Sequence, residues 1–328
     1  MTDPDVTVVL CTYNRAEMLR NALQSVTLQD TRNGFTYEIL VIDNASTDNT
    51  RSVVMEVASG SAVPIRYVQE QTEGVVPARN RGVREARGSW LAFFDDDQLA
   101  EPDWLSELLS AALLTRSTLV GGTILPQLPA SHSVALGPIS RSVLGEHLFV
   151  GTARPCQGKK IPSTGNMLVA REIFDSNGLF DTSMVAGGED TEFVRRARAS
   201  GITISIAPSA KIHHIIPASR VTPKYLRWTS IRTGYQFATL DLKYFGRASM
   251  LGRALARTGQ AILVNTPLLI FAGLKRDPAS CLDRRCLLWR AVGYVRGAVS
   301  LAGPRFFAQS GLLSELNIRT GRTPCPNS

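Results

Sequence analysis

The sequence is poor in the residues that build disulfide frameworks and zinc sites. It has five cysteines and four histidines among 328 residues. The cysteine count is odd, and four residues separate Cys281 from Cys286, a spacing that fits no common zinc motif. Reduced thiols are therefore expected, as in a protein of the cytosol.

Motifs of several large function classes are also missing. No G-x-G-x-x-G follows the first expected strand and no G-x-x-x-x-G-K-[ST] occurs, which argues against dinucleotide binding and against P-loop enzymes. There is no zinc-finger, helix-turn-helix or RNP-like pattern, so no nucleic acid partner is expected. The first residues, Met1–Asp5, lack the basic and apolar regions of a signal peptide, so none is expected.

Negative charge is scarce in the last third of the chain. Residues 1–216 hold 19 Lys and Arg against 24 Asp and Glu, a net charge of −5, whereas residues 217–328 hold 17 against 4, a net charge of +13. The two values sum to the net charge of +8. This shift predicts two parts, 1–216 and 217–328, that meet different surroundings. An anionic membrane surface would attract the second part.

Long apolar runs are absent. The most apolar stretch, Ala261–Leu274, has 14 residues, whereas a spanning helix needs about 20. Residues 217–328 are therefore expected to form a basic helical region that associates peripherally with a membrane. A packed helical subdomain with a solvated basic face is one alternative, and a re-entrant hairpin built from 261–274 is another.

Short apolar runs alternate with amphipathic stretches in residues 1–216. This order predicts an α/β fold with a mainly parallel sheet flanked by helices. Residues 126–160 are poorly patterned, and a loop of that length is usually functional. Strands are expected at Val6–Leu10, Tyr37–Ile42, Ile65–Gln69, Trp90–Phe94, Leu119–Leu125, Gly165–Ala170 and Ile202–Ile206.

Three carboxylates, Asp95–Asp97, directly follow the apolar run Trp90–Phe94. Unpaired charges are too costly to bury in a core, and ligands of such sheets bind where the strands end. Residues i and i+2 of an extended chain point the same way, so Asp95 and Asp97 are expected to converge on one ion while Asp96 faces elsewhere. Carboxylate oxygens suit Mg²⁺ or Mn²⁺. An acidic turn without a ligand is the alternative.

Five short motifs occur in order along residues 5–216. They are Val8–Arg15, Val41–Asp48, Ala78–Gly82, Asp95–Asp97 and Glu189–Asp190. Together they resemble glycosyltransferase family 2, the inverting enzymes of GT-A fold that use nucleotide sugars, and most of all the bacterial exopolysaccharide type. The resemblance implies transfer of a sugar from a nucleotide-diphosphate sugar, with UDP expected, to a saccharide or polyprenyl-linked acceptor. It also implies a peripheral location at the cytoplasmic face of the inner membrane.

The resemblance implies a set of metal ligands. Asp97 would hold Mn²⁺ or Mg²⁺, with Asp95 and His213 as further ligands, and the ion would offset charge on the diphosphate as the glycosidic bond breaks. Asp95 and Asp96 would also face the nucleotide sugar. His214 could exchange roles with His213, and a hydrogen-bonded histidine at a strand edge is the alternative for either.

The resemblance also implies contacts to the nucleotide. Thr12, Tyr13 and Arg15 would frame the base and the phosphates where the first strand ends. Asp43 would accept a hydrogen bond from the base, and Arg79 would meet phosphate or base. For Arg15 and Arg79, a solvated charge on a helix face is the alternative.

Inversion requires a base that takes the proton of the acceptor hydroxyl. Asp190 is the candidate, with Glu189 beside it, because a carboxylate at a helix N-terminus stays ionised near neutral pH. Simple capping of that helix is the alternative. Arg227 and Trp228 lie where processive members of the family carry Q-x-x-R-W, with Lys224 in place of the glutamine. They are expected to touch the acceptor or its diphosphate lipid.

Two other functions remain as hypotheses. A nucleotidyltransferase would carry a Gly-rich basic loop after the first strand, and Cys11–Arg15 contains no glycine. A non-catalytic binder of nucleotide sugars or carbohydrates would not need Asp95, Asp97 and Asp190, all of which are present.

Overall fold

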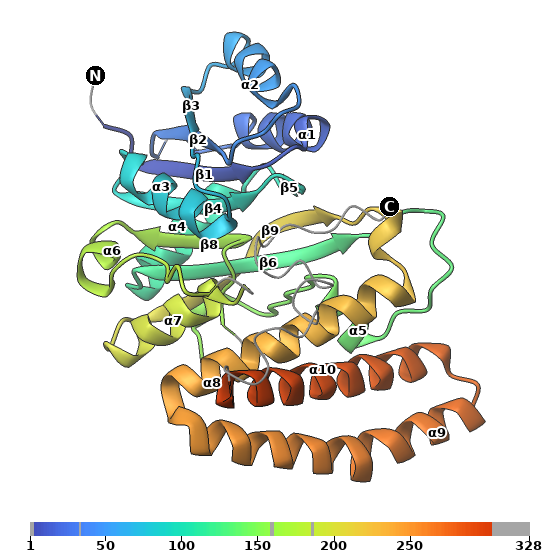
Figure 1. Ribbon diagram of the computed structural model, residues 1–328. Coiled ribbons are helices and arrows are strands. Elements are labelled where there is room, and N and C mark those ends of the chain that lie inside the picture. Colours follow the sequence, from blue (N-terminus) through green and yellow to red (C-terminus); the bar gives the residue numbers. More distant parts are fainter. Residues whose placement is uncertain (1–2, 33, 158–160, 185–186, 304–328) are drawn as a thin grey trace. The chain divides into compact units, whose positions relative to one another are not determined.

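The computed structural model describes residues 3–32, 34–157, 161–184 and 187–303, and they fall into two compact units (Figure 1). The first unit comprises Met1–Gln127, His147–Thr182 and Glu189–Ile215. The second comprises Leu128–Glu146, Ser183–Gly188 and Ile216–Ser328. The chain leaves the first unit for the last time at Ile215, next to the predicted boundary at residue 216. Two short segments from within residues 1–216 nevertheless pack with the second unit.

A single mixed sheet forms the centre of the first unit. Within the described residues its strands follow the order β3-β2-β1-β4-β8-β6-β9-β5, and β7 pairs with β9. Pairings among β3, β2, β1 and β4 are parallel, whereas β8 runs antiparallel to both β4 and β6. The predicted α/β sheet with flanking helices is confirmed. It is a mixed sheet, in which β6 and β9 also pair in parallel. The strands are β1 Val6–Thr12, β2 Tyr37–Asp43, β3 Ile65–Gln69, β4 Trp90–Asp95, β5 Gln98–Ala100, β6 Leu119–Gln127, β7 Arg154–Pro155, β8 Asn166–Ala170 and β9 Ile204–Ile215.

Helices cover both faces of this sheet (Figure 1). The alternation of side chains along β1 shows why: Val8 and Leu10 pack with Leu19 of α1 and Trp104 of α4, whereas Val9 packs in the cluster on the opposite face. Both faces of the strands are therefore buried, as expected for a sheet between two helical layers. The helices are α1 Ala16–Thr27, α2 Thr50–Ser59, α3 Val75–Glu85, α4 Trp104–Thr115, α6 Glu172–Asn177 and α7 Glu189–Ala199.

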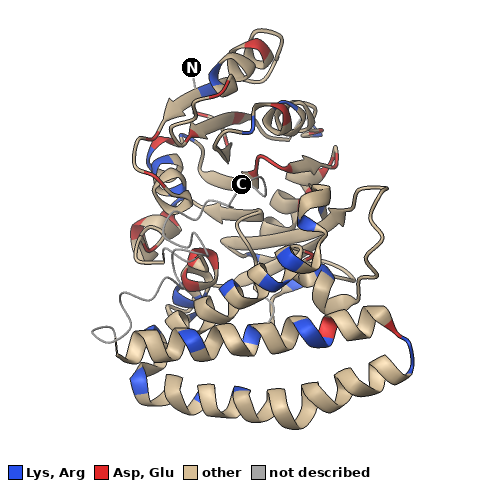
Figure 2. Cartoon of the chain, turned by 45° about the vertical axis from the view of Figure 1, so that its right-hand side comes forward, with Lys and Arg blue, Asp and Glu red and all other residues tan. Residues whose placement is uncertain are grey.

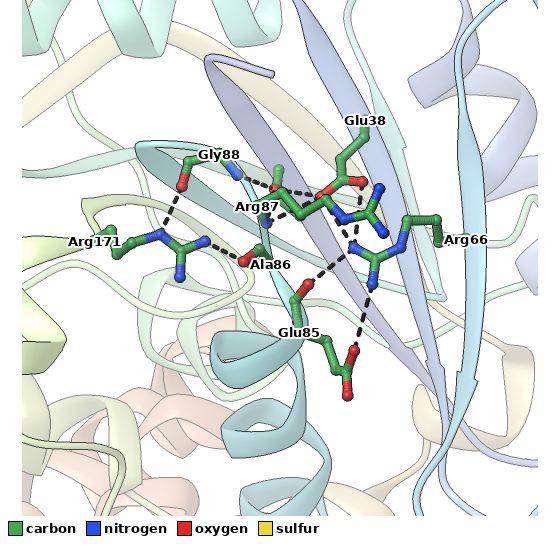
Figure 3. A network of polar contacts seen from close by, with 8 residues as sticks. Glu38, Arg66, Glu85, Ala86, Arg87, Gly88 and Arg171 are labelled. Atoms are coloured by element: carbon green, nitrogen blue, oxygen red, sulfur yellow. Dashed lines mark hydrogen bonds and ion pairs between the residues drawn. The ribbon is translucent and has the colours of Figure 1, made fainter. Parts of the chain in front are cut away.

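A polar network lies at the end of the sheet where β1 begins (Figure 3). Glu38 is 3% exposed, and its Oε1 accepts hydrogen bonds from Thr7 Oγ1 at 2.8 Å and from the backbone N–H of Arg87 at 3.1 Å. Arg66 Nη1 lies 3.3 Å from the same carboxylate. Arg171 donates to the backbone carbonyl of Gly88. The network ties β1, β2 and β3 to the turn that precedes β4, and so fixes the strands whose other ends form the site.

The second unit is helical. Asp283 accepts from the backbone N–H of Ile139 and from both the N–H and Oγ of Ser140, which holds α5 against α10. Helix α8 bends at Gly246, whose φ of 77° and ψ of 175° are not helical. By length and composition alone, one helical stretch in the described residues, Pro223–Leu274, could cross a membrane. The elements are α5 Pro138–Val143, a 3₁₀ turn Ala218–Arg220, α8 Pro223–Gln260, a π turn Ala261–Asn265, α9 Thr266–Leu274 and α10 Pro278–Ala302.

Candidate functional site

Polar side chains gather where three neighbouring parallel strands end. In the register of the sheet Thr12 pairs with Asp43, and Cys11 pairs with Asp95. Strand ends at this edge of an α/β sheet are the usual place for a ligand. The sequence therefore brings together side chains separated by more than eighty residues because the strands that carry them are hydrogen-bonded in parallel.

The acidic triplet does not continue the strand. Strand β4 ends at Asp95, and Asp96 and Asp97 form the turn into β5. Arg15 Nη1 lies 2.9 Å from Asp96 Oδ1 and 3.1 Å from Asp97 Oδ2, whereas Asp95 Oδ1 accepts from Arg79 Nη2 at 3.2 Å. The prediction that Asp96 faces elsewhere is wrong, because the alternation of an extended chain stops where the chain turns. Asp96 and Asp97 instead both contact the guanidinium of Arg15.

Arg15 is the resident counterion of this buried acidic cluster. Asp96 is 5% exposed, and its Oδ2 also accepts from Thr12 Oγ1 at 2.8 Å. Burial raises the pKa of Asp96 to about 6, with Arg15 opposing the shift and Asp97 adding to it. Burial lowers the pKa of Arg15, but attraction to Asp96 and Asp97 outweighs it and raises the pKa above its ordinary value. The alternative of a solvated helix charge does not apply to Arg15.

The two histidines of β9 separate. His214 Nε2 lies 3.4 Å from Asp97 Oδ2, whereas His213 Nε2 lies 3.2 Å from Glu101 Oε1. Adjacent residues on a strand point to opposite sides, so only one of the two can face the triplet. The structure brings His214, rather than the preferred His213, to Asp97.

Asp97 and His214 would be the donor pair for a divalent cation at this site. No group of three or more His, Cys, Asp or Glu side chains in the described part of the chain is arranged to hold a metal ion. Two protein ligands suffice when a diphosphate and waters complete the shell, which is the usual arrangement for Mg²⁺. Neighbouring ligands of an octahedral ion lie about 3 Å apart, so the 3.4 Å between Asp97 Oδ2 and His214 Nε2 fits such an ion.

Arg79 links the end of β4 to the start of α7. Its side chain is 9% exposed and forms ion pairs with Asp95 and Glu189. Burial lowers the pKa of Arg79, but attraction to Glu189, Asp95 and also Asp190 outweighs it and raises the pKa above its ordinary value. The alternative of a solvated charge fails here too. Asp190, in the first turn of α7, therefore lies close enough to Arg79 to interact with its charge.

Asp190 is the more accessible of the two acids at this helix start. Glu189 is 5% exposed and held by Arg79, whereas Asp190 is half-buried. The backbone N–H of Thr191 donates to Asp190 Oδ1 at 2.6 Å. The side chain of Asp190 thus lies at a helix N-terminus and is accessible from solvent.

Asp43 has a partner that the sequence did not reveal. Its Oδ2 accepts from the hydroxyl of Tyr67 at 2.6 Å and its Oδ1 from the backbone N–H of Ser46 at 2.9 Å. Tyr67 comes from the middle of β3, where a tyrosine indicates no more than sheet packing. Tyr13, half-buried in the loop after β1, completes the residues expected at the nucleotide.

Arg227 and Trp228 belong to the second unit. Both lie on α8, where Arg227 is exposed and the ring of Trp228 lies between Tyr225, at 5.7 Å, and the guanidinium of Arg232, at 5.4 Å. Their expected contact with the acceptor stays a prediction.

Comparison with known proteins identifies relatives for most of the chain. The family described as glycosyl transferase family 2 matches residues 7–175. The succinoglycan biosynthesis protein ExoM of Rhizobium meliloti is 29% identical over 234 residues, which are 70% of this chain and 72% of ExoM. The glycosyltransferase AglE of Haloferax volcanii is 27% identical over 206 residues, 63% of this chain and 65% of AglE, so the chain spans just under two thirds of that relative.

Two solved structures share the fold. The mannosyltransferase PcManGT from Pyrobaculum calidifontis, in complex with GDP-Man and Mn²⁺, has a TM-score of 0.62 at 18% identity, over 90% of this chain and 88% of that one. TarS 1–349 of S. aureus, in complex with UDP-GlcNAc, has a TM-score of 0.52 at 16% identity, over 92% of both chains. These likenesses establish the GT-A-like architecture.

Proposed function

Since the chain belongs to glycosyl transferase family 2 and is a glycosyltransferase, we propose that it transfers a sugar from a UDP-sugar, with inversion, to a saccharide or polyprenyl-linked acceptor. The observation that carries this proposal is the acidic cluster at the ends of β1 and β4, with Asp97 and His214 side by side. The choice of UDP follows the family resemblance; TarS is in complex with UDP-GlcNAc and PcManGT with GDP-Man. Competition between UDP and GDP for the site tests that choice.

The donor would bind at the strand ends. Asp97 and His214 would hold Mg²⁺ or Mn²⁺, which supplies positive charge to the departing diphosphate. Asp43, fixed by Tyr67, offers an acceptor for the base, and Thr12 steadies Asp96. Arg79 would keep Asp95 oriented beside the sugar.

Asp190 would act as the base that takes the proton of the acceptor hydroxyl. Its first-turn position in α7 favours the carboxylate, and Arg79 lies within electrostatic reach. Glu189 is a positioning residue, because its ion pair with Arg79 joins α7 to Asp95.

Asp190→Asn tests this assignment. The variant should bind UDP-sugar as well as the wild-type protein and lose transfer by roughly 10²–10⁴-fold, the usual contribution of a general base. Asp175→Asn, at an exposed acid on α6, is the matched control and should leave both unchanged. Binding is measured by calorimetry and transfer by release of UDP. Turnover retained by Asp190→Asn would reject Asp190 as the base.

The proposed setting is the synthesis of a bacterial surface polysaccharide at the cytoplasmic face of the inner membrane. The name of ExoM, a succinoglycan biosynthesis protein, supports the class of product. The basic second unit supports attraction to an anionic leaflet. A screen of UDP-sugars with lipid-linked and soluble saccharide acceptors tests the product.

A further inference from the structure

The second unit exposes a concentration of apolar side chains. Of the eighteen large apolar side chains that are most exposed in the described residues, ten lie between residues 245 and 274. Single exposed apolar residues are normal, whereas a contiguous group marks a surface that meets an apolar partner. These ten, the exposed apolar face, are Phe245, Leu251, Leu255, Ile262, Leu263, Val264, Leu268, Ile270, Phe271 and Leu274.

One continuous helical segment carries most of this face. After the bend at Gly246 the chain stays helical through the rest of α8, the π turn and α9 to Leu274. At 1.5 Å per residue the segment is about 40 Å long. Leu251, Leu255 and Ile262 are spaced by four and seven residues, so they lie on one side of the helix. The 14-residue run seen in the sequence is therefore the C-terminal half of a longer helical segment.

Two of the three arginines within this segment engage the unit itself, whereas Arg247 is exposed. Arg253 Nη1 lies 3.2 Å from Asp241 Oδ1, and the guanidinium of Arg257 lies 4.3 Å from the ring centroid of Tyr294 on α10. The guanidinium of Arg253 also lies 4.0 Å from the ring centroid of Phe245, so its charge stands against a member of the exposed apolar face. An arginine that borders an apolar surface in this way suits the headgroup level of a bilayer.

The charge around the face is mainly positive, with Asp277 at the N-cap of α10 as an acidic exception. Residues 242–276 contain no Asp or Glu, and Lys275 and Arg276 stand at the turn between α9 and α10. Figure 2 shows that most of the charged residues on the long helices are Lys and Arg. This charge complements anionic lipid headgroups, each of which attracts a nearby Lys or Arg.

We infer that the exposed apolar face inserts into one leaflet of an anionic membrane, with the helix parallel to the surface. Helix α10 packs along α8 and α9 and exposes Arg285 and Arg296. If α10 crossed the bilayer together with the segment from 247 to 274, Arg285 and Arg296 would lie in the hydrocarbon core. The segment therefore lies at the interface although it is long enough to span. This inference is independent of the sugar-transfer reaction.

Flotation of the full chain with lipid vesicles tests the inference. The vesicles are phosphatidylcholine alone or phosphatidylcholine and phosphatidylglycerol in equal parts, without nucleotide sugar. The double variant Leu255→Ser/Leu263→Ser removes two side chains that are each 76% exposed. The matched control, Leu28→Ser/Leu114→Ser, removes two that are each 75% exposed in the first unit.

The wild-type protein and the control should float with the anionic vesicles. The Leu255→Ser/Leu263→Ser variant should bind them at least roughly tenfold less, because buried apolar surface drives interfacial insertion. Equal binding by that variant, or no binding by the wild type, would overturn the inference. A wild-type dimer that the variant converts to monomer, without vesicle binding, would also overturn it by assigning the face to a second copy. Binding of UDP-sugar should be unchanged in both variants, so failure here and failure of the proposed function are separate results.

Discussion

The most informative single residue is Arg15, because it neutralises two buried carboxylates that would otherwise repel each other. Asp96 and Asp97 are each 5% exposed, and one nitrogen of Arg15 contacts both. The proposed divalent cation needs the same Oδ2 of Asp97 that Arg15 now contacts. The guanidinium of Arg15 and a divalent cation would therefore compete for Asp97 Oδ2.

Arg15→Ala should make the stability of the protein depend on divalent cation. Without the guanidinium, the variant should lose about 1–3 kcal/mol of unfolding free energy in chelator, because two buried carboxylates lose their counterion. Saturating Mn²⁺ should restore part of this loss by supplying charge at Asp97. Urea unfolding with and without Mn²⁺ measures both effects.

Arg20→Ala is the matched control, since Arg20 pairs on the surface with Glu56. It should show no extra dependence on Mn²⁺. An equal effect of Mn²⁺ on the wild-type protein, the control and Arg15→Ala would show that Arg15 and the ion do not share a site.

At the scale of residues, the sequence indicated which residues belong to the site better than it indicated which of them contact one another. The triplet Asp95–Asp97 was predictable because charged residues directly after an apolar strand need a ligand or a partner. The pairing of Asp96 with Arg15 was not, because the turn after Asp95 leaves no periodic signal. Tyr67 was also missed, because its hydroxyl reaches Asp43 only once β2 and β3 are paired.

At the scale of elements, the network around Glu38 holds the parallel strands in register (Figure 3). It lies at the beginnings of these strands, whereas the site lies where they end. Glu38 joins β2 to Thr7 of β1, to Arg66 of β3 and to the turn before β4. A shift of any of these strands would also move Thr12, Asp43 or Asp95 at the far end. The network is thus a structural support of the site.

Glu38→Ala should cost about 1–3 kcal/mol of unfolding free energy, because it leaves the buried hydroxyl of Thr7 without its acceptor. The N–H of Arg87 and the guanidinium of Arg66 lose one acceptor each but keep Thr7 and Glu85. Chemical unfolding of the wild-type and variant proteins measures the loss. Glu56→Ala, whose side chain is 64% exposed, is the control and should leave stability unchanged. A loss no larger than that of the control would reject the network as a source of stability.

Most strands of the first unit follow from local pattern, including β8, but β9 does not. Strand Ile65–Gln69 was predicted with its observed bounds, and β1, β2 and β4 each extend one or two residues further than predicted. By contrast, a strand was predicted at Ile202–Ile206, whereas β9 runs from Ile204 to Ile215. It passes Pro208 at an irregularity in its pairing with β6, the kind of position where a sheet tolerates proline.

At the scale of the whole molecule, the two units are interleaved in sequence. Charge distribution alone predicted a change near residue 216, because 217–328 is basic. It could not predict that residues 128–146 pack in the second unit, since their anchor is Asp283, far away in the chain. A long loop with little pattern thus belongs to the helical unit for reasons of tertiary contact.

The central claim, that the acidic cluster binds a nucleotide sugar through a divalent cation, is tested most directly by calorimetric titration of UDP-sugar into the full chain with Mn²⁺ or with chelator. The account predicts binding by the wild-type protein in Mn²⁺ only, and a matching rise in melting temperature, because the ligand binds the folded state alone. Asp97→Asn should abolish both, whereas Asp103→Asn, at a 45% exposed carboxylate nearby in sequence, should keep both. Equal binding by Asp97→Asn, or binding in chelator, would contradict the account.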